Sequence, residues 1–228
     1  GSESMSGILQ KLGLKDGESI DHPWINKALE RAQQKVEARN FDIRKTLLKF
    51  DNVLNDQRQV IFSQRNNIIN KKEALNYADD FLDEIILRLL ELKRKYLANP
   101  KNSDFIIQTK SILGKTFEET EANSLLEINN DEFSHKIKKK FNEKRKEREE
   151  LFKKEQAEGI EKRIFLQLID QNWKSHIQYL EQLRGVIGLR SYGQRDPLVE
   201  YKKEAFTLFE NLLNKLKTDL ITILLNLK

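Results

Sequence analysis

The longest helical pattern in the chain lies between residues 25 and 68. Its apolar side chains recur about every 3.6 residues, which is the period of a straight α-helix rather than the 3.5-residue period of a supercoil. After Pro23, no Gly or Pro interrupts the pattern. One helix over this range would be roughly 65 Å long, more than a compact domain requires. The stripe consists of Ile25, Leu29, Ala32, Val36, Arg39, Ile43, Leu47, Phe50, Leu54, Gln57, Ile61, Gln64 and Ile68.

The composition favours an elongated all-α chain. Charged residues make up 34% of the 228 residues, and the apolar fraction of 38% is low for a globular domain. The chain contains only 9 Gly and 3 Pro, which is too few for the frequent turns of an all-β fold. We therefore expect an all-α fold in which one very long helix packs with a helical hairpin.

The middle of the chain predicts three further helices. The first covers about residues 72–98 and ends before Pro100. The second covers about 103–113 and is ended by Gly114, and residues 129–131 offer a cap for the third. Within the third helix, residues 136–154 hold ten Lys or Arg and four Glu. We interpret this segment as a solvated surface with ion pairs, and a phosphate- or lipid-headgroup-binding helix is the alternative.

Residues 160–228 predict a helical hairpin. Two apolar stripes are long enough to pack antiparallel and to lie along the long helix. The first arm carries Ile160, Ile164, Leu168, Trp173, Ile177, Leu180 and Leu183. The second arm carries Tyr201, Ala205, Leu208, Leu212, Leu216, Leu220, Ile223 and Leu227.

The connection between the two arms, residues 185–197, is longer than two adjacent helices require. Three of the 9 glycines lie in it, and Asp196 followed by Pro197 is a typical start for the second arm. Apolar and aromatic side chains beside arginines on an exposed tip are typical of a contact surface. The side chains expected on this tip are Ile187, Leu189, Arg190, Tyr192 and Arg195.

The sequence contains no recognisable arrangement of catalytic residues. The glycines near the start do not have the spacing of a phosphate-binding loop. His22, His135 and His176 have no ligand-spaced partners, so we interpret each as structural or solvated rather than as a metal ligand. The chain has no Cys and no apolar run of membrane-spanning length. Its net charge of +5 permits anionic partners without requiring them.

Two separated blocks of sequence resemble the SecA family of bacterial preprotein translocase ATPases. Residues 37–58 (EARNFDIRKTLLKFDNVLNDQR) resemble the long scaffold helix of that family, together with residues 22–24 and 63–66. In the hairpin, residues 168–176 (LIDQNWKSH), 188–197 (GLRSYGQRDP) and 200–206 (EYKKEAF) resemble the two-helix finger. The blocks occur in the family's order, whereas the middle region matches the family's helical wing by position only.

The resemblance implies a division into three parts: residues 1–70 with the approach segment and scaffold helix, 71–158 as an inserted helical wing, and 159–228 as the two-helix finger. It implies a non-catalytic module that couples motor-domain movement to preprotein movement through the SecYEG channel. The ATP and magnesium site of the parent protein would lie in nucleotide-binding domains in cis, outside this fragment. The expected location is the bacterial cytoplasm, peripheral to the inner membrane. Expected partners are those domains, SecYEG and unfolded preprotein, with anionic lipid left open and no nucleic acid.

The resemblance also implies roles for matching residues. The fingertip residues that would contact preprotein or channel are Ile187, Leu189, Arg190, Tyr192, Gln194 and Arg195. The residues that would contact the motor domains or the scaffold are Arg39, Arg44, Asp51, Asp56, Arg58 and Trp173. We interpret Trp173 as core packing between finger and scaffold helix. Arg39, Gln57 and Gln64 lie on the apolar stripe itself, where each must find a polar partner, either a motor domain or a neighbour in the helical bundle.

A basic helical nucleic-acid-binding module is the alternative function. It would use residues 136–154 as the phosphate contact and would bind with a steep salt dependence. The glutamates within that segment, and the lack of interleaved aromatic side chains for base stacking, argue against it.

Overall fold

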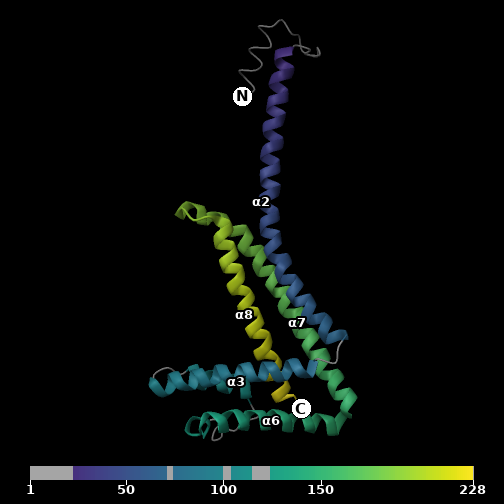
Figure 1. The fold of residues 1–228 in the computed structure, drawn as a ribbon, viewed down its shortest axis with the longest axis vertical. Coiled ribbons are helices and arrows are strands. Elements are labelled where there is room, and N and C mark those ends of the chain that lie inside the picture. Colours follow the sequence, from purple (N-terminus) through teal and green to yellow (C-terminus); the bar gives the residue numbers. More distant parts are fainter. Residues whose placement is uncertain (1–22, 71–73, 100–103, 115–123, 228) are drawn as a thin grey trace. The chain divides into compact units, whose positions relative to one another are not determined.

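The computed structural model describes residues 23–70, 74–99, 104–114 and 124–227, and the approach segment predicted at the start of the chain lies outside them. Every regular element in these ranges is helical, as the all-α prediction requires. In chain order the elements are α2 (Pro23–Asn70), α3 (Ala74–Ala98), α4 (Asp104–Leu113), α6 (Asn130–Phe152), α7 (Lys154–Val186), the 3-10 helix η2 (Ile187–Gly193) and α8 (Pro197–Asn226) (Figure 1).

The predicted long helix is confirmed, because α2 is one helix of 48 residues. The chain divides into two compact units, residues 1–51 and 52–228, and the division falls inside α2. In the first unit, most apolar side chains of the stripe are exposed, with Leu29 at 58% and Val36 at 53%, whereas Ile25 and Phe50 are half-buried. In the second unit, Gln57, Ile61 and Ile68 of the same helix are buried.

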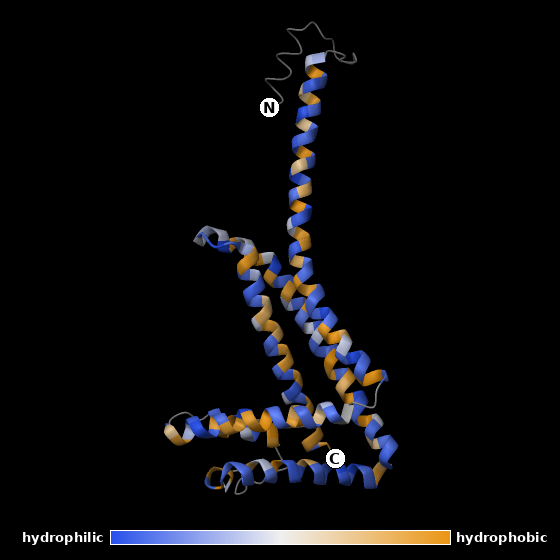
Figure 2. Ribbon diagram, viewed as in Figure 1, coloured by the Kyte–Doolittle hydropathy of each residue, from blue (hydrophilic) through white to orange (hydrophobic). Residues whose placement is uncertain are grey.

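The core of the second unit forms where the hairpin of α7 and α8 meets α3, α4 and α6. Figure 1 shows α3 and α6 running beside each other across one end of the hairpin, and Figure 2 shows apolar residues at intervals along α3 and α8, whereas α6 is mostly hydrophilic. The ring of Phe81 in α3 packs edge-on against Phe165 in α7, with 5.6 Å between the centroids. On α8, Leu216, Leu220 and Leu224 are almost fully buried in the same core.

Local signals in the sequence place several helix ends correctly. Asn129 caps α6, because its side chain accepts a hydrogen bond of 2.8 Å from the backbone N–H of Glu132. Gly114 ends α4 with a positive φ of 52°. A Cβ at Gly114 would lie 2.7 Å from Oδ1 of Asn226, so both the backbone conformation and the space favour glycine at this position.

The boundary between the third predicted helix and the first hairpin arm was wrong. The sequence pattern continued the helix to residue 154, but α6 ends at Phe152 and α7 begins at Lys154. Lys153 between them has φ 61° and ψ 149°. No Gly or Pro marks this corner in the sequence. Contacts around this corner join residues that are distant in the sequence, such as Arg148 and Leu224.

The predicted stripe of the first arm was partly wrong. Trp173 and Leu180 are buried as expected, whereas Ile160, Ile164 and Leu168 are only half-buried. The fully buried side chains of α7 are Ala157, Glu161, Phe165, Ile169, Trp173, His176 and Leu180. Between residues 160 and 169 the buried face therefore lies one position further along the helix than predicted. On α8 the prediction was closer, because Tyr201, Ala205, Leu212, Leu216 and Leu220 are all buried.

Candidate functional site

The tip of the hairpin is a short 3-10 helix rather than an irregular loop. We define the fingertip as residues 187–196, which join α7 to α8. Tyr192 is 88% exposed and Leu189 is 65% exposed. The expectation that Ile187 is displayed was wrong, because its side chain is only 3% exposed. Since η2 winds back onto the ends of the two arms, its first apolar residue is buried and the later ones face outward.

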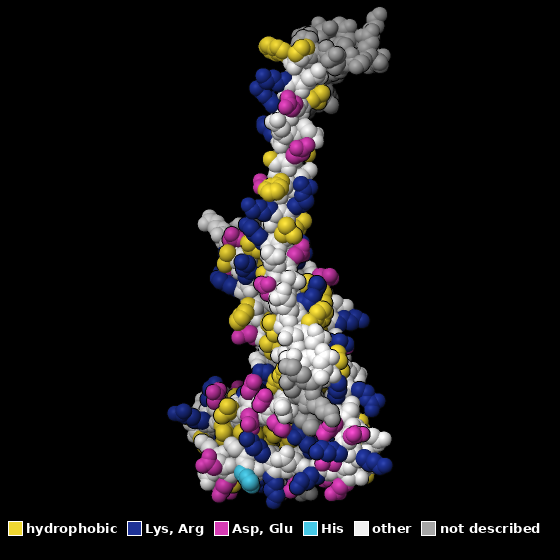
Figure 3. All heavy atoms as spheres, turned by 45° about the vertical axis from the view of Figure 1, so that its right-hand side comes forward, with side chains coloured by type: hydrophobic (Ala, Val, Ile, Leu, Met, Phe, Trp, Pro, Cys, Tyr) yellow, Lys and Arg dark blue, Asp and Glu magenta, His cyan; other side chains and the backbone are white. Residues whose placement is uncertain are grey.

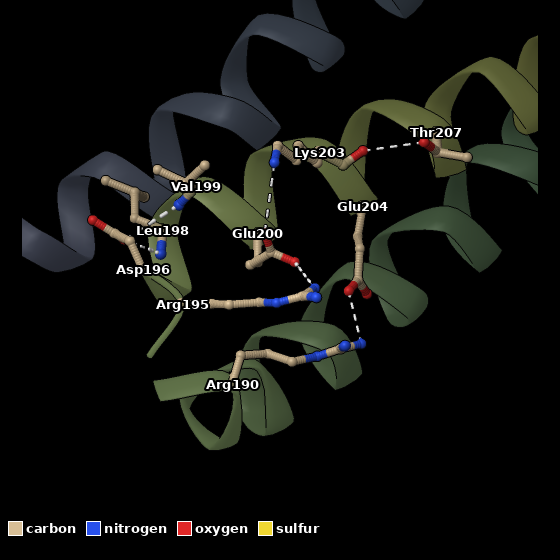
Figure 4. Close-up of polar contacts among 9 residues, drawn as sticks. All are labelled: Arg190, Arg195, Asp196, Leu198, Val199, Glu200, Lys203, Glu204 and Thr207. Atoms are coloured by element: carbon tan, nitrogen blue, oxygen red, sulfur yellow. Dashed lines mark hydrogen bonds and ion pairs between the residues drawn. The ribbon is translucent and has the colours of Figure 1, made fainter. Parts of the chain in front are cut away.

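Two arginines of the fingertip are paired with glutamates on α8 (Figure 4). Arg190 Nη2 lies 2.8 Å from Glu204 Oε1, and Arg195 Nη1 lies 3.2 Å from Glu200 Oε2. Lys203 adds a longer contact of 3.6 Å to Glu200. Exposed pairs of this kind contribute about 0–1 kcal/mol each to stability. Their main effect here is to hold the two guanidinium groups against α8.

Backbone contacts fix the turn between η2 and α8. Gln194 has a left-handed φ of 57°, and its N–H donates to the carbonyl of Ser191 at 3.0 Å. Asp196 caps α8, because its Oδ1 accepts hydrogen bonds from the backbone N–H groups of Leu198 at 2.7 Å and Val199 at 3.3 Å. The predicted start of the second arm is therefore confirmed. The turn holds the exposed end of η2 in one position on the two arms.

A buried polar cluster joins the finger to α2. The amide Nε2 of Gln57 donates to the carbonyl of Ala205 at 3.1 Å, and its Oε1 lies 2.8 Å from Nε2 of His176. Because the Gln57 amide nitrogen is used by Ala205, its oxygen faces the imidazole, so Nε2 of His176 carries the proton. Burial lowers the pKa of His176. Trp173 is buried beside this cluster, with its ring centroid 5.6 Å from that of His176.

Two further contacts fasten α2 to α7 away from this cluster. Arg65 Nε pairs with Asp170 Oδ1 at 3.1 Å, and Lys162 Nζ donates to the carbonyl of Ile69 at 2.7 Å. The finger is thus held along the last four turns of α2 by contacts from three positions of α7. Of the two glutamines on the stripe of α2 in this unit, Gln57 finds its polar partners inside the bundle. Gln64 Oε1 is buried without a hydrogen-bond partner among the described residues.

The charged residues expected to contact motor domains lie on exposed positions of α2. Arg39, Arg44 and Asp51 are exposed in the first unit, and Asp56 and Arg58 are exposed in the second. Their exposure leaves them accessible to a partner, and their roles stay predictions.

At least four of the eight basic residues of α6 form ion pairs, namely Lys138, Lys144, Arg145 and Arg148. Lys138 pairs with Asp83 at 2.6 Å and Arg145 with Asp79 at 2.9 Å, both on α3. Figure 3 shows Lys and Arg interspersed with Asp and Glu over the α3–α6 end of the molecule. Such a mixed surface favours the interpretation of a paired, solvated helix and gives no support to a nucleic-acid contact. Within the described ranges, none of the helices combines the length and the apolar character that crossing a membrane requires.

Sequence reasoning missed two buried polar contacts. His176 was interpreted as structural or solvated, and the sequence did not pair it with Gln57. The spacing of Phe165, Ile169, Trp173, His176 and Leu180 could have placed His176 on the core face of its helix. The pairing of Arg148 with Glu161 at 2.7 Å had no signal, because Arg148 lies within the long charged run 143–150 and nothing nearby marks Glu161 as its partner.

Comparison with known proteins agrees with this architecture. A family model described as the SecA wing and scaffold domain matches residues 19–228. The protein translocase subunit SecA of Pelagibacter ubique (strain HTCC1062) is 68% identical over all 228 residues. The chain spans 27% of the length of that relative. The long scaffold helix, the helical hairpin and the intervening helices all lie within the matched range, and the chain therefore belongs to the SecA family, in which it corresponds to the wing and scaffold region.

Proposed function

We propose that this chain is the non-catalytic scaffold and finger module of a protein-translocation motor. In this role it couples ATP-driven movement of motor domains to the movement of preprotein through the SecYEG channel. The Pelagibacter ubique relative is a protein translocase subunit, which supports a role in protein transport. We further propose the division into scaffold helix (residues 1–70), wing (71–158) and finger (159–228).

The observation that carries the proposal is the exposure of Tyr192 on a well-anchored tip. Tyr192 is 88% exposed although the two arms that carry the tip are tightly packed. An amphipathic ring can contact many polypeptide sequences through its apolar face without reading any one of them. Leu189, Arg190, Gln194 and Arg195 would surround such a contact. Ile187 is buried, so we assign it to anchoring the tip rather than to contact.

The partners follow from the same role. The nucleotide-binding domains of the full-length protein would hold ATP and magnesium and would contact α2 through Arg39, Arg44, Asp51, Asp56 and Arg58. Trp173 would support the finger on the scaffold helix. Unfolded preprotein and SecYEG would meet the fingertip, at the cytoplasmic side of the bacterial inner membrane. Anionic lipid is a further partner that the proposal allows, and nucleic acid is not one.

The fingertip role is tested by Tyr192→Ala in the full-length translocase. Preprotein transport into inverted membrane vesicles should fall at least tenfold, because the tip loses its only aromatic contact. Tyr179→Ala is the matched control, since Tyr179 is a 60% exposed tyrosine on the shaft of α7. Transport that is equal in the two variants would contradict the proposal.

The scaffold role is tested by Arg44→Ala in the same full-length protein. If α2 carries movement between motor domains and finger, this change should alter the ratio of preprotein-stimulated to basal ATP hydrolysis. Arg31→Ala, another exposed arginine on α2, is the control. An unchanged ratio for Arg44→Ala would remove this residue from the coupling surface.

A further inference from the structure

The corner between α6 and α7 has a strained backbone. Lys153 adopts φ 61° and ψ 149°, close to a region that is essentially confined to glycine. Residues other than glycine keep this backbone conformation only where surrounding contacts hold them in it. Lys153 is also the N-cap of α7, and its carbonyl accepts hydrogen bonds from the N–H groups of Gln156 and Ala157. The contacts that hold the corner must therefore come from the residues on either side of it.

Arg148 on α6 supplies these contacts. Its Nη2 lies 2.7 Å from Oε1 of Glu161 on α7, and its Nη1 donates to the carbonyl of Leu224 on α8 at 2.6 Å. The two charged side chains are 2% and 4% exposed. Leu224 lies in the last turn of α8, where carbonyl groups lack helical partners and favour a cation. One guanidinium thus ties together three helices across the corner.

Arg145, one turn earlier on α6, reinforces the same cluster. Its Nη1 lies 2.9 Å from Asp79 Oδ1 on α3, its Nε lies 3.6 Å from Glu161 Oε1, and its guanidinium lies 4.9 Å from the ring centroid of Phe141. Removing one member of a buried pair leaves an uncompensated charge, which is strongly unfavourable. However, Arg148 Nε and Glu161 Oε2 find no hydrogen-bond partner among the described residues. The cluster therefore joins specific atoms of neighbouring helices, but some of its buried polar atoms have no hydrogen-bond partner among the described residues.

We propose that Lys153 is a hinge under strain and that the Arg148, Glu161 and Leu224 contacts are the latch that holds it closed. While the latch is closed, α6 and the helices packed on it move as one body with the finger. When the latch opens, Lys153 relaxes to an ordinary backbone conformation and α6 turns relative to α7. Because Arg148 also holds the end of α8, a displacement of α8 along its axis would release the latch. This device concerns the coupling of α6 to the finger and does not depend on the role proposed for Tyr192.

The latch can be tested on this chain by measuring the distance between α6 and α7. The chain has no Cys, so Asn142→Cys and Gln171→Cys introduce two unique, exposed sites for spin labels. Pulsed electron–electron double resonance then gives the distribution of distances between the labels. Glu161→Gln and Arg148→Lys weaken the latch. Glu147→Gln is the control, because Glu147 forms an exposed ion pair with Lys144 on the same helix.

We expect one narrow distance population in the parent and in Glu147→Gln, and a second population in Glu161→Gln and Arg148→Lys. Adding Lys153→Gly to Glu161→Gln should reduce the second population at least twofold, because glycine removes the strain that drives opening. A single unchanged population in all variants with intact helical circular dichroism would overturn the proposal. If the single variants do not fold, the paired change Arg148→Met with Glu161→Leu removes both charges, and a single narrow population in that variant would overturn it as well.

Discussion

His176 and Gln57 are separated by 119 residues in the sequence, and their side chains meet 2.8 Å apart in the interface between the finger and α2. Gln57 also donates to the carbonyl of Ala205, so a single amide bridges both arms of the hairpin. A polar bridge inside an apolar interface favours one register of the helices over its neighbours, because any shift leaves buried polar groups without partners.

Replacing Gln57 by Leu should therefore destabilise the chain. The imidazole N–H of His176 loses its acceptor in a buried site, which costs about 1–3 kcal/mol. Chemical denaturation followed by circular dichroism measures this loss. Gln33→Leu is the control, because Gln33 forms an exposed hydrogen bond to Glu37 of 2.9 Å, and its removal should change the free energy of unfolding by less than about 0.5 kcal/mol. Equal effects of the two changes would contradict the role of the buried bridge.

The stability of the chain should also depend on pH through His176. Burial lowers the pKa of His176 from its ordinary value of 6.5. Between the lowered pKa and 6.5, the unfolded chain binds a proton that the folded chain does not bind. The contribution to stability is therefore complete above pH 6.5 and declines as the pH falls below it.

The measurement is the denaturation midpoint as a function of pH, for the parent and for His176→Gln. The difference between the two curves gives the pH dependence that is due to His176. Burial also raises the pKa of Asp219, but both proteins keep this residue, so its effect cancels in the difference. Parallel curves from about pH 5 to 8 would show that His176 has no shifted pKa in the folded chain.

Two glycines should respond in opposite ways to alanine. Gly185 lies near the end of α7, and a Cβ there would meet nothing within 4 Å. Gly185→Ala should stabilise the chain by about 0.5–1 kcal/mol, because alanine loses less backbone freedom on folding. Gly114→Ala should destabilise it by at least about 1–2 kcal/mol, since φ is +52° and the new Cβ would crowd Asn226. Thermal unfolding of both variants checks the signs, and a loss of stability in Gly185→Ala would show that its position is more constrained than the space around it suggests.

The cap of α8 gives a fourth prediction. Asp196 accepts hydrogen bonds from the N–H groups of Leu198 and Val199, so Asp196→Ala should cost about 0.5–2 kcal/mol. Asp196→Asn keeps an acceptor oxygen and should retain most of the stability. Hydrogen exchange of the first turn of α8 locates the effect. Fast exchange confined to that turn in Asp196→Ala is the expected result, and unchanged exchange would contradict it.

The sequence predicted the elements whose signals are local. The period of the apolar stripe gave α2, and Asn129, Gly114 and Asp196 marked helix ends through side chains and backbone freedom that act within a few residues. The buried face of α8 was also predicted well, because its apolar residues are closely spaced along one side.

What the sequence could not predict depends on contacts between distant residues. The break at Lys153 has no Gly or Pro, and it is held by Arg148, Glu161 and the end of α8, which no local pattern brings together. Between residues 160 and 169 the buried face of α7 was displaced by one position, because this helix contacts several others and buries a broad part of its circumference. The pairing of Gln57 with His176 is likewise a property of the packed helices.

The burial of Ile187 and the exposure of Tyr192 separate two tasks within one short 3-10 helix. The residue that secures the tip is not the residue that the tip offers to its surroundings. The side chain at position 192 can therefore be replaced by a smaller, larger or charged one while the packing of the two arms stays the same. The hairpin can therefore present different side chains at position 192 on the same backbone. A panel of substitutions at this position would compare how each side chain contacts a partner.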